Sequence, residues 1–407
     1  MGKLFRGSKM IKKRIGIYLD LEPYGGGSFQ YVQSLLEALD SLDKDKYEVA
    51  VFYRQELWKK YLTPFSFSLQ KAKAWNAKSN FFGRVYLRCL RLMKEDSVRC
   101  MRIFSSISSF AKQFDAAGLS LVIFPMQGAI FPALIKTRSV GVIHDLMHRY
   151  ESFEEASGRG EYEAREFGFR TLCRSADVIF VDSEVGKEQV MESYGNDLAE
   201  KLAVLPFTPP KYLFQESSGE KSESPVLPKK FFFYPAQFWK HKNHRNLLLA
   251  LEKLKRQGFL DVHMVFVGSK KNGYEEVVQL IHEKHLENNV TILGYVADAH
   301  MRILYQKARA MVMPTYFGPT NIPPLEAMAM GCPVAVSGRY AMPWQVQEAG
   351  LTFSPDRVDE IVEVLERLWT DDVLCRTLAL KGKERAKYFS QEAFNERFQA
   401  AIFPLLG

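Results

Sequence analysis

Residues 314–334 read PTYFGPTNIPPLEAMAMGCPV, and this stretch decides the fold. A short apolar strand before it ends in a loop rich in Gly and Pro, and the loop enters an amphipathic helix. The free backbone amides at the start of such a helix favour an anionic ligand, and Glu326 lies one turn further along. A carboxylate there suits the two hydroxyls of a ribose. A plain loop followed by a buried helix explains the pattern about as well.

Short apolar runs alternate with helical patterns on both sides of this stretch. They predict strands at residues 14–19, 47–53, 119–124, 139–143, 177–181 and 202–205, and again at 231–234, 263–267, 291–293, 310–313, 333–336 and 351–353. Strands that alternate with helices form parallel sheets, so the fold class is α/β with two doubly wound, Rossmann-like domains. Such sheets bind ligands at the carboxyl ends of their strands, which places the site in a deep cleft where the domains face each other.

The length and composition agree with two globular domains. A chain of 407 residues is too long for one core, and a polar segment rich in Ser, Pro, Glu and Lys predicts a linker at 209–228. The domains are then 1–208 and 229–407. The five cysteines are scattered and never spaced as CxxC, which argues against a disulfide framework or structural zinc and indicates a reducing compartment.

The sequence predicts neither a secretory signal nor a membrane span. The first 14 residues carry six basic groups, but the apolar run after them has only the length of a strand, so we expect a cytoplasmic protein. Residues 116–135 contain no charge. Pro125, Gln127, Gly128 and Pro132 interrupt them, so they predict a buried strand and a loop.

The net charge of +8 is unevenly distributed. Residues 57–112 contain twelve Lys or Arg against only Glu95 and Asp96, and aromatic residues are interleaved among the cations. This basic aromatic insertion suits an anionic membrane surface, a solvated pair of basic helices or a nucleic acid. No nucleic-acid-binding signature accompanies it, so we expect no nucleic acid as partner and keep the membrane surface and the solvated helices open.

Two further motifs follow the first strand of each half. Gly25, Gly26 and Gly27 precede a helix from Ser28, and their backbone could approach an anion or a sugar, or form an ordinary tight turn. Neither GxGxxG nor GxxxxGK[ST] occurs, which excludes the common dinucleotide and P-loop signatures. In the second half, Lys242 and Asn243 stand at a helix start, where a lysine could neutralise a diphosphate or lie exposed.

We expect no metal site. His241 and His244, like His282 and His285, lack a third ligand within sequence reach. The run DKD at 43–45 matches the DxD pattern of metal-dependent transferases, but it ends the first helix, where a solvated surface is the simpler interpretation.

Together these features, over residues 14–400, resemble the retaining glycosyltransferases of family 4, which have the GT-B fold. Within that family the chain is similar to bacterial mannosyl- and glycosyltransferases of surface polysaccharide assembly. The motifs that carry the resemblance are the 318–334 loop and helix, Lys242-Asn243, His144-Asp145-Leu146, Asp182-Ser183 and the early glycine loop.

The resemblance implies a role for each matching residue. Glu326 would bind the nucleotide ribose, Lys242 the donor diphosphate, and His144 would line the sugar pocket; these three form the expected catalytic set. The expected donor-binding residues are Gly26, Gly27, Gln237, Lys242, Asn243, Pro319, Thr320, Asn321, Ile322 and Glu326. No cofactor and no metal are implied. Residues 1–208 would bind the acceptor and 229–407 the nucleotide sugar, with the last helix packing back on the N-terminal domain.

Two positions depart from the family pattern. Gly318 stands where the family often has a glutamate that contacts the sugar, and Asn321 and Thr320 are the candidates to replace it. Gln237 stands where the family usually has an arginine, and Lys240 or Arg339 could supply that cation. These departures concern the sugar more than the fold.

The expected activity is that of a metal-independent, retaining hexosyltransferase. The donor would be a nucleotide-diphosphate sugar, with GDP-mannose favoured, and the acceptor a glycan, lipid-linked or of the lipopolysaccharide or O-antigen type. Such an enzyme would be cytoplasmic or peripheral at the inner face of the membrane. Two alternatives stay open: a catalytically silent GT-B protein that binds a nucleotide or a partner, and a sugar-nucleotide epimerase.

Overall fold

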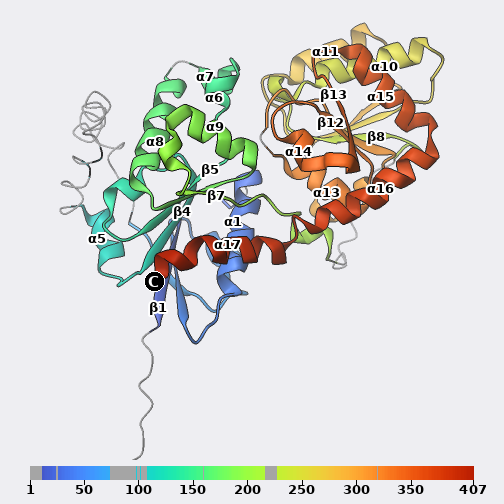
Figure 1. Ribbon diagram of the computed structural model, residues 1–407. Helices are drawn as coiled ribbons and strands as arrows, with labels where there is room; N and C mark the ends of the chain where they lie inside the picture. Colours follow the sequence, from blue (N-terminus) through green and yellow to red (C-terminus); the bar gives the residue numbers. More distant parts are fainter. Residues whose placement is uncertain are drawn as a thin grey trace, which may run out of the picture.

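The computed structural model describes residues 12–23, 26–73, 98, 101, 108–158, 160–215, 227–318 and 320–407. Two parallel sheets organise them, one in each half of the chain (Figure 1). We call the elements around the first sheet the first domain and those around the second sheet the second domain. Most of the basic insertion at 57–112, part of the linker at 209–228, and Pro319 lie outside the described residues.

The first sheet has seven strands in the order β3-β2-β1-β4-β5-β6-β7. Its strands are β1 (Lys13–Leu19), β2 (Tyr47–Tyr53), β3 (Ser68–Lys71), β4 (Leu121–Gln127), β5 (Ser139–Ile143), β6 (Val178–Val181) and β7 (Leu202–Val204). Its helices are α1 (Gly27–Asp40), α2 (Trp58–Leu62), α5 (Ser109–Asp115), α6 (Met147–Tyr150), α7 (Glu154–Ser157), α8 (Glu161–Ser175) and α9 (Glu184–Tyr194). The central strands are buried on both faces, as parallel strands under helices must be.

The second sheet has six strands in the order β10-β9-β8-β11-β12-β13. Its strands are β8 (Phe232–Pro235), β9 (Met264–Val267), β10 (Val290–Ile292), β11 (Ala310–Met313), β12 (Val334–Ser337) and β13 (Gly350–Phe353). The helices that follow are α10 (His244–Arg256), α11 (Tyr274–Glu283), α12 (Asp298–Lys307), α13 (Ile322–Met330), α14 (Met342–Val346), α15 (Val358–Thr370), α16 (Asp372–Lys387) and α17 (Gln391–Leu406). Because β8 and β11 are neighbours, the loops after them emerge side by side.

The last helix crosses from the second domain to the first, where it lies along α1 (Figure 1). The Gln391 amide donates to the backbone carbonyl of Ser34 at 3.0 Å, and the buried Phe398 ring packs 6.0 Å from Phe180. The helix therefore adds to the core of the first domain, as the resemblance implied.

The predicted strands agree closely with the observed ones, and three of them match exactly. The uncharged stretch 116–135 forms β4 and a short 3-10 helix, Phe131–Leu134, as predicted. One strand, β3, was missed because its sequence SLQK alternates between half-buried and exposed residues at a sheet edge. No helix among the described residues has both the length and the apolar character that a membrane crossing requires.

Candidate active site

Lys242 and the loop of residues 318–322 meet at the carboxyl ends of β8 and β11. Lys242 follows β8 and Asn321 follows β11, and the Lys242 Nζ donates to the Asn321 Oδ1 at 3.3 Å. Asn321 directly precedes α13, so the lysine also lies near the positive end of that helix. The arrangement combines a cation and a helix N-terminus, which together attract an anion.

A tight turn holds Lys242 in this position. Residues Lys240–Lys242 form a single 3-10 turn, and Asn243 has a left-handed backbone with φ of 57°. The Asn243 side chain caps α10 and donates to the backbone carbonyls of Pro314 and Pro355 at 3.0 and 2.9 Å. Asn243 therefore stabilises both the turn and the loop after β11. Its side-chain amide is occupied by hydrogen bonds with backbone groups.

Burial gives Lys242 an unusual charge state. It lowers the pKa of the ammonium group to about 8, against the opposing effect of the Asp145 and Glu155 carboxylates. A lysine with such a pKa gains from a new anionic neighbour, because the anion stabilises the charged form.

Glu326 lies on the first turns of α13 and is 5% exposed. Its two carboxylate oxygens accept hydrogen bonds from the hydroxyls of Tyr212 and Tyr305, each at 2.5 Å. Burial raises the pKa of the carboxyl, and the two tyrosine hydroxyls oppose that shift. An ionised carboxylate has about four acceptor positions, so two remain for further hydroxyl donors. The sequence did not identify these tyrosines, which come from the linker and from α12.

Asn321 fills the space beside Gly318. A Cβ added at Gly318 would overlap the side-chain amide of Asn321, and Gly318 has a φ of 154°. Gln345 holds Asn321 on both sides, since it accepts from the Asn321 backbone N–H at 3.1 Å and donates to its carbonyl at 2.6 Å. Among the described residues, the Asn321 Nδ2 is buried without a hydrogen-bond partner. Asn321 thus offers a fixed, unused donor next to Lys242.

The first domain contributes an imidazole and a glycine turn. His144 follows β5, and its ring lies between Tyr31 and Phe207 at centroid distances of 4.6 and 5.0 Å. Burial lowers the pKa of His144 to about 4, so the ring is neutral at pH 7. Its Nε2 has no partner within the part of the chain that the structure describes.

The glycine turn lies directly opposite the 318–322 loop. Gly26 has a φ of 60° and caps α1, and a Cβ added at Gly27 would lie 3.5 Å from the Ile322 Cδ1 of the second domain. Predicted residues from both halves of the sequence are therefore brought together. Gln237 is exposed and accepts a hydrogen bond from the Trp239 indole at 2.9 Å.

The facing edges of the two domains are in contact across the expected cleft. Asp182 accepts hydrogen bonds from Thr320, Glu155 pairs with His241, and Glu151 bonds to Arg339 and Tyr340. Arg339, one of the two candidates for the missing family arginine, also pairs with Asp356 at 2.5 Å. It is thus already engaged by two carboxylates.

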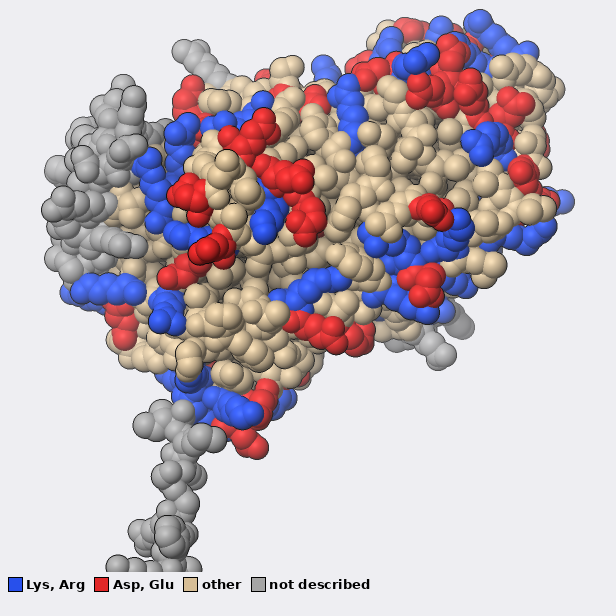
Figure 2. All heavy atoms as spheres, viewed as in Figure 1, with Lys and Arg blue, Asp and Glu red and all other residues tan. Residues whose placement is uncertain are grey.

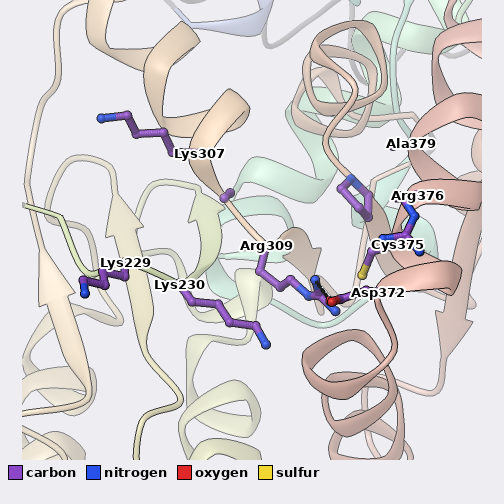
Figure 3. Close-up of a pocket in the computed structure, with 10 residues that line it drawn as sticks. Lys229, Lys230, Lys307, Arg309, Asp372, Cys375, Arg376 and Ala379 are labelled. Atoms are coloured by element: carbon purple, nitrogen blue, oxygen red, sulfur yellow. Dashed lines mark ion pairs between the residues drawn. The ribbon is translucent and has the colours of Figure 1, made fainter.

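A second cavity, of about 480 Å³, lies at the opposite, amino ends of β8, β11 and β12 (Figure 3). Basic side chains line it, but two of them cap the C-terminus of α15: Arg309 donates to the Leu368 carbonyl at 2.5 Å and Lys230 to the Trp369 carbonyl. Arg309 also pairs with Asp372 at 2.5 Å. These cations have a structural role there. Elsewhere, the described residues include no group of three or more His, Cys, Asp or Glu that could hold a metal ion.

Solved structures share this two-domain architecture. The HepE protein of Anabaena, solved with UDP and glucose, superposes with a TM-score of 0.69 at 16% identity, covering 96% of this chain and 99% of that chain. The sucrose-phosphate synthase of Thermosynechococcus elongatus gives a TM-score of 0.69 at 18% identity, with 97% and 99% covered. Identities this low show the fold alone. The fold is GT-B, as predicted.

The sequence defines the family more narrowly. Residues 218–387, which carry Lys242, the 318–322 loop and Glu326, match the family described as glycosyl transferases group 1. The match covers less than half of the chain.

Two curated relatives are mannosyltransferases of Escherichia coli. The O-antigen chain mannosyltransferase B is 33% identical over 153 residues, which cover 37% of this chain and 40% of that protein. The serotype-specific mannosyltransferase WbdA is 24% identical over 271 residues, which cover 62% of this chain and 32% of that protein. The matched stretches therefore span less than half the length of either relative.

The packing of Asn321 against Gly318 leads to a stability prediction. Gly318→Ala should lower the free energy of unfolding by about 1–3 kcal/mol, because the new methyl group overlaps the Asn321 amide. Urea unfolding of the full chain, followed by circular dichroism, measures this change. The double variant Gly318→Ala/Asn321→Ala removes the overlap and should recover part of the loss; a Gly318→Ala protein as stable as the wild type would contradict the packing argument.

Proposed function

We propose that the protein is a retaining glycosyltransferase that transfers a sugar, mannose from GDP-mannose in the first instance, to a growing glycan. The observation that carries the proposal is the meeting of Lys242, Asn321 and the start of α13 within the segment that matches the group 1 glycosyl transferases. The mannosyltransferase relatives support mannose as the sugar. Their O-antigen role supports a lipid-linked or lipopolysaccharide-type acceptor.

In this proposal the donor lies along the second domain. Its diphosphate binds between the Lys242 ammonium and the N-terminus of α13, where the unused Asn321 Nδ2 can donate to it or to the sugar. Its ribose hydroxyls donate to the free acceptor positions of Glu326. The neutral His144 faces the sugar from the first domain and accepts or donates a hydrogen bond through Nε2.

The chemistry needs little help from a side-chain base. The bond between the sugar carbon and the phosphate oxygen breaks, and Lys242 and the helix N-terminus stabilise the negative charge on the leaving diphosphate. The acceptor hydroxyl attacks from the face that the diphosphate leaves, and its proton passes to the departing phosphate oxygen. In this proposal the configuration of the sugar carbon is retained.

Substitutions at the two charged residues test the assignment. Lys242→Ala and Glu326→Ala should each lower transfer from radiolabelled GDP-mannose about 100- to 1000-fold, because each removes a group that contacts the donor. The measurement is label incorporated into lipid-linked glycan, with a bacterial membrane extract as acceptor and UDP-glucose as the competing donor. The exposed Lys253→Ala and Glu348→Gln variants are matched controls that should keep wild-type activity. Full transfer by both site variants would contradict the proposal.

The lowered pKa of Lys242 predicts how donor affinity varies with pH. Below about pH 8 the free protein already carries the ammonium charge, whereas above it the group must take up a proton to bind a diphosphate. The affinity for GDP should therefore fall as pH rises from 8 to 9.5, by up to about tenfold per pH unit. Isothermal titration calorimetry measures this slope. Lys242→Arg keeps its charge and should give a flat profile; an equal slope in that variant would assign the titration to another group.

We also propose that the basic insertion 57–112 binds an anionic membrane surface, where a lipid-linked acceptor would be found. On the face shown in Figure 2, acidic and basic side chains are interspersed over the described residues. In the sequence, the insertion carries twelve Lys or Arg against only Glu95 and Asp96. Flotation with phosphatidylglycerol vesicles should be strong at 50 mM salt and fall steeply at 500 mM, because salt screens such attraction. Absent or salt-insensitive flotation would count against this attachment.

A further inference from the structure

A carboxylate of the first domain binds the 318–322 loop of the second domain. Asp182 directly follows β6, and its Oδ2 accepts hydrogen bonds from the Thr320 backbone N–H at 3.0 Å and from the Thr320 hydroxyl at 2.6 Å. Asp182 is 1% exposed and Thr320 is also buried. Both bonds exist only while the two domains are in contact.

Burial of the Asp182 carboxylate makes this contact costly in folding free energy. Burial raises the pKa of Asp182 to about 7, with a further contribution from the Asp145 carboxylate, while the bonds from Thr320 and Ser183 oppose the shift. Burial, and after it the Asp182 carboxylate, raises the pKa of the Tyr31 hydroxyl. A buried acid costs folding free energy, whereas an amide or a hydroxyl could join the two surfaces without that cost.

The loop is held from two sides at consecutive residues. Asp182 binds the amide of Thr320 from the first domain, and Gln345 binds the amide of Asn321 from within the second. The Asn321 side-chain oxygen in turn accepts a hydrogen bond from the Lys242 ammonium. Thr320, which Asp182 binds, is thus directly next to Asn321, which contacts Lys242. Of the three contacts made by Asp182, Gln345 and Lys242, the Asp182 contact alone depends on the first domain.

We propose that Asp182 is a positioning residue for the donor site: it fixes Thr320, and through it the Asn321 amide beside Lys242, when the domains come together. This inference rests on the proposed transferase function. The two hydrogen bonds from Thr320 to Asp182 do not use Lys242, Asn321 Nδ2 or Glu326, so these groups retain the capacity to hold the donor. Approach of the domains therefore completes the geometry of the loop.

A second contact between the domains provides the matched control. Glu151 accepts hydrogen bonds from Arg339 at 3.2 Å and from the Tyr340 hydroxyl at 2.6 Å, and neither partner belongs to the 318–322 loop. Glu151→Gln weakens the contact between the domains but leaves the loop held. A comparison of this variant with Asp182 variants separates loop positioning from general contact strength.

A double-mutant cycle tests the pairing. Asp182→Ala should lower kcat for GDP-mannose about 10- to 100-fold with a smaller change in KM, because the loop is misplaced during the reaction. Thr320→Val keeps the backbone N–H and should lose less. The double variant should resemble Asp182→Ala, since both substitutions remove parts of one contact. Glu151→Gln should change kcat less than about threefold.

Conservative replacement separates positioning from charge. Asp182→Asn keeps one oxygen that can accept both bonds and should recover most of the kcat lost in Asp182→Ala. Thermal unfolding of each variant confirms that it is folded, and the cycle is run on the Asp182→Asn background if Asp182→Ala is not. Additive effects of Asp182 and Thr320 substitutions, or equal losses in Asp182→Ala and Glu151→Gln, would overturn the inference. Absence of transfer by the wild type would instead contradict the proposed function.

Discussion

The position of one short loop, residues 318–322, determines the candidate site. The loop leaves β11 and begins α13 with the Asn321 side chain at the neighbouring strand end, where its oxygen accepts a hydrogen bond from Lys242. Backbone amides in a loop have no partners from a sheet or a helix, so side chains must hold them. Gln345 and Asp182 do so, from different domains. The arrangement of the site and the contact between the domains therefore depend on the same loop.

The sequence predicted the fold well because parallel strands under helices have a simple signature. Strands β2, β5 and β11 are predominantly apolar runs, and each begins and ends where the pattern predicted. The strand β3 has no such run. Its four residues form a strand because they pair with β2 at the edge of the sheet, and that pairing partner cannot be recognised from SLQK alone.

The candidate site was predictable to the extent that it follows from strand order. Lys242 and Asn321 follow two strands that pair in parallel, so their proximity is a consequence of topology. The partners of Glu326 and Thr320 are different. Tyr212 is 114 residues from Glu326, and Asp182 is 138 residues from Thr320. No local periodicity relates such positions: the course of the linker brings Tyr212 to Glu326, and the contact between the domains brings Asp182 to Thr320.

The residue that replaces a family carboxylate affects the electrostatics of the whole site. A side chain at position 318 would meet the Asn321 amide, which itself lies at hydrogen-bond distance from Lys242. Asn321 occupies that space with a neutral amide, whose oxygen accepts from Lys242 and whose nitrogen remains a donor. In the proposed reaction, the lysine charge then remains available to the leaving diphosphate. In the same proposal, the unpartnered Asn321 nitrogen donates to an oxygen atom of the sugar nucleotide, where a carboxylate would accept.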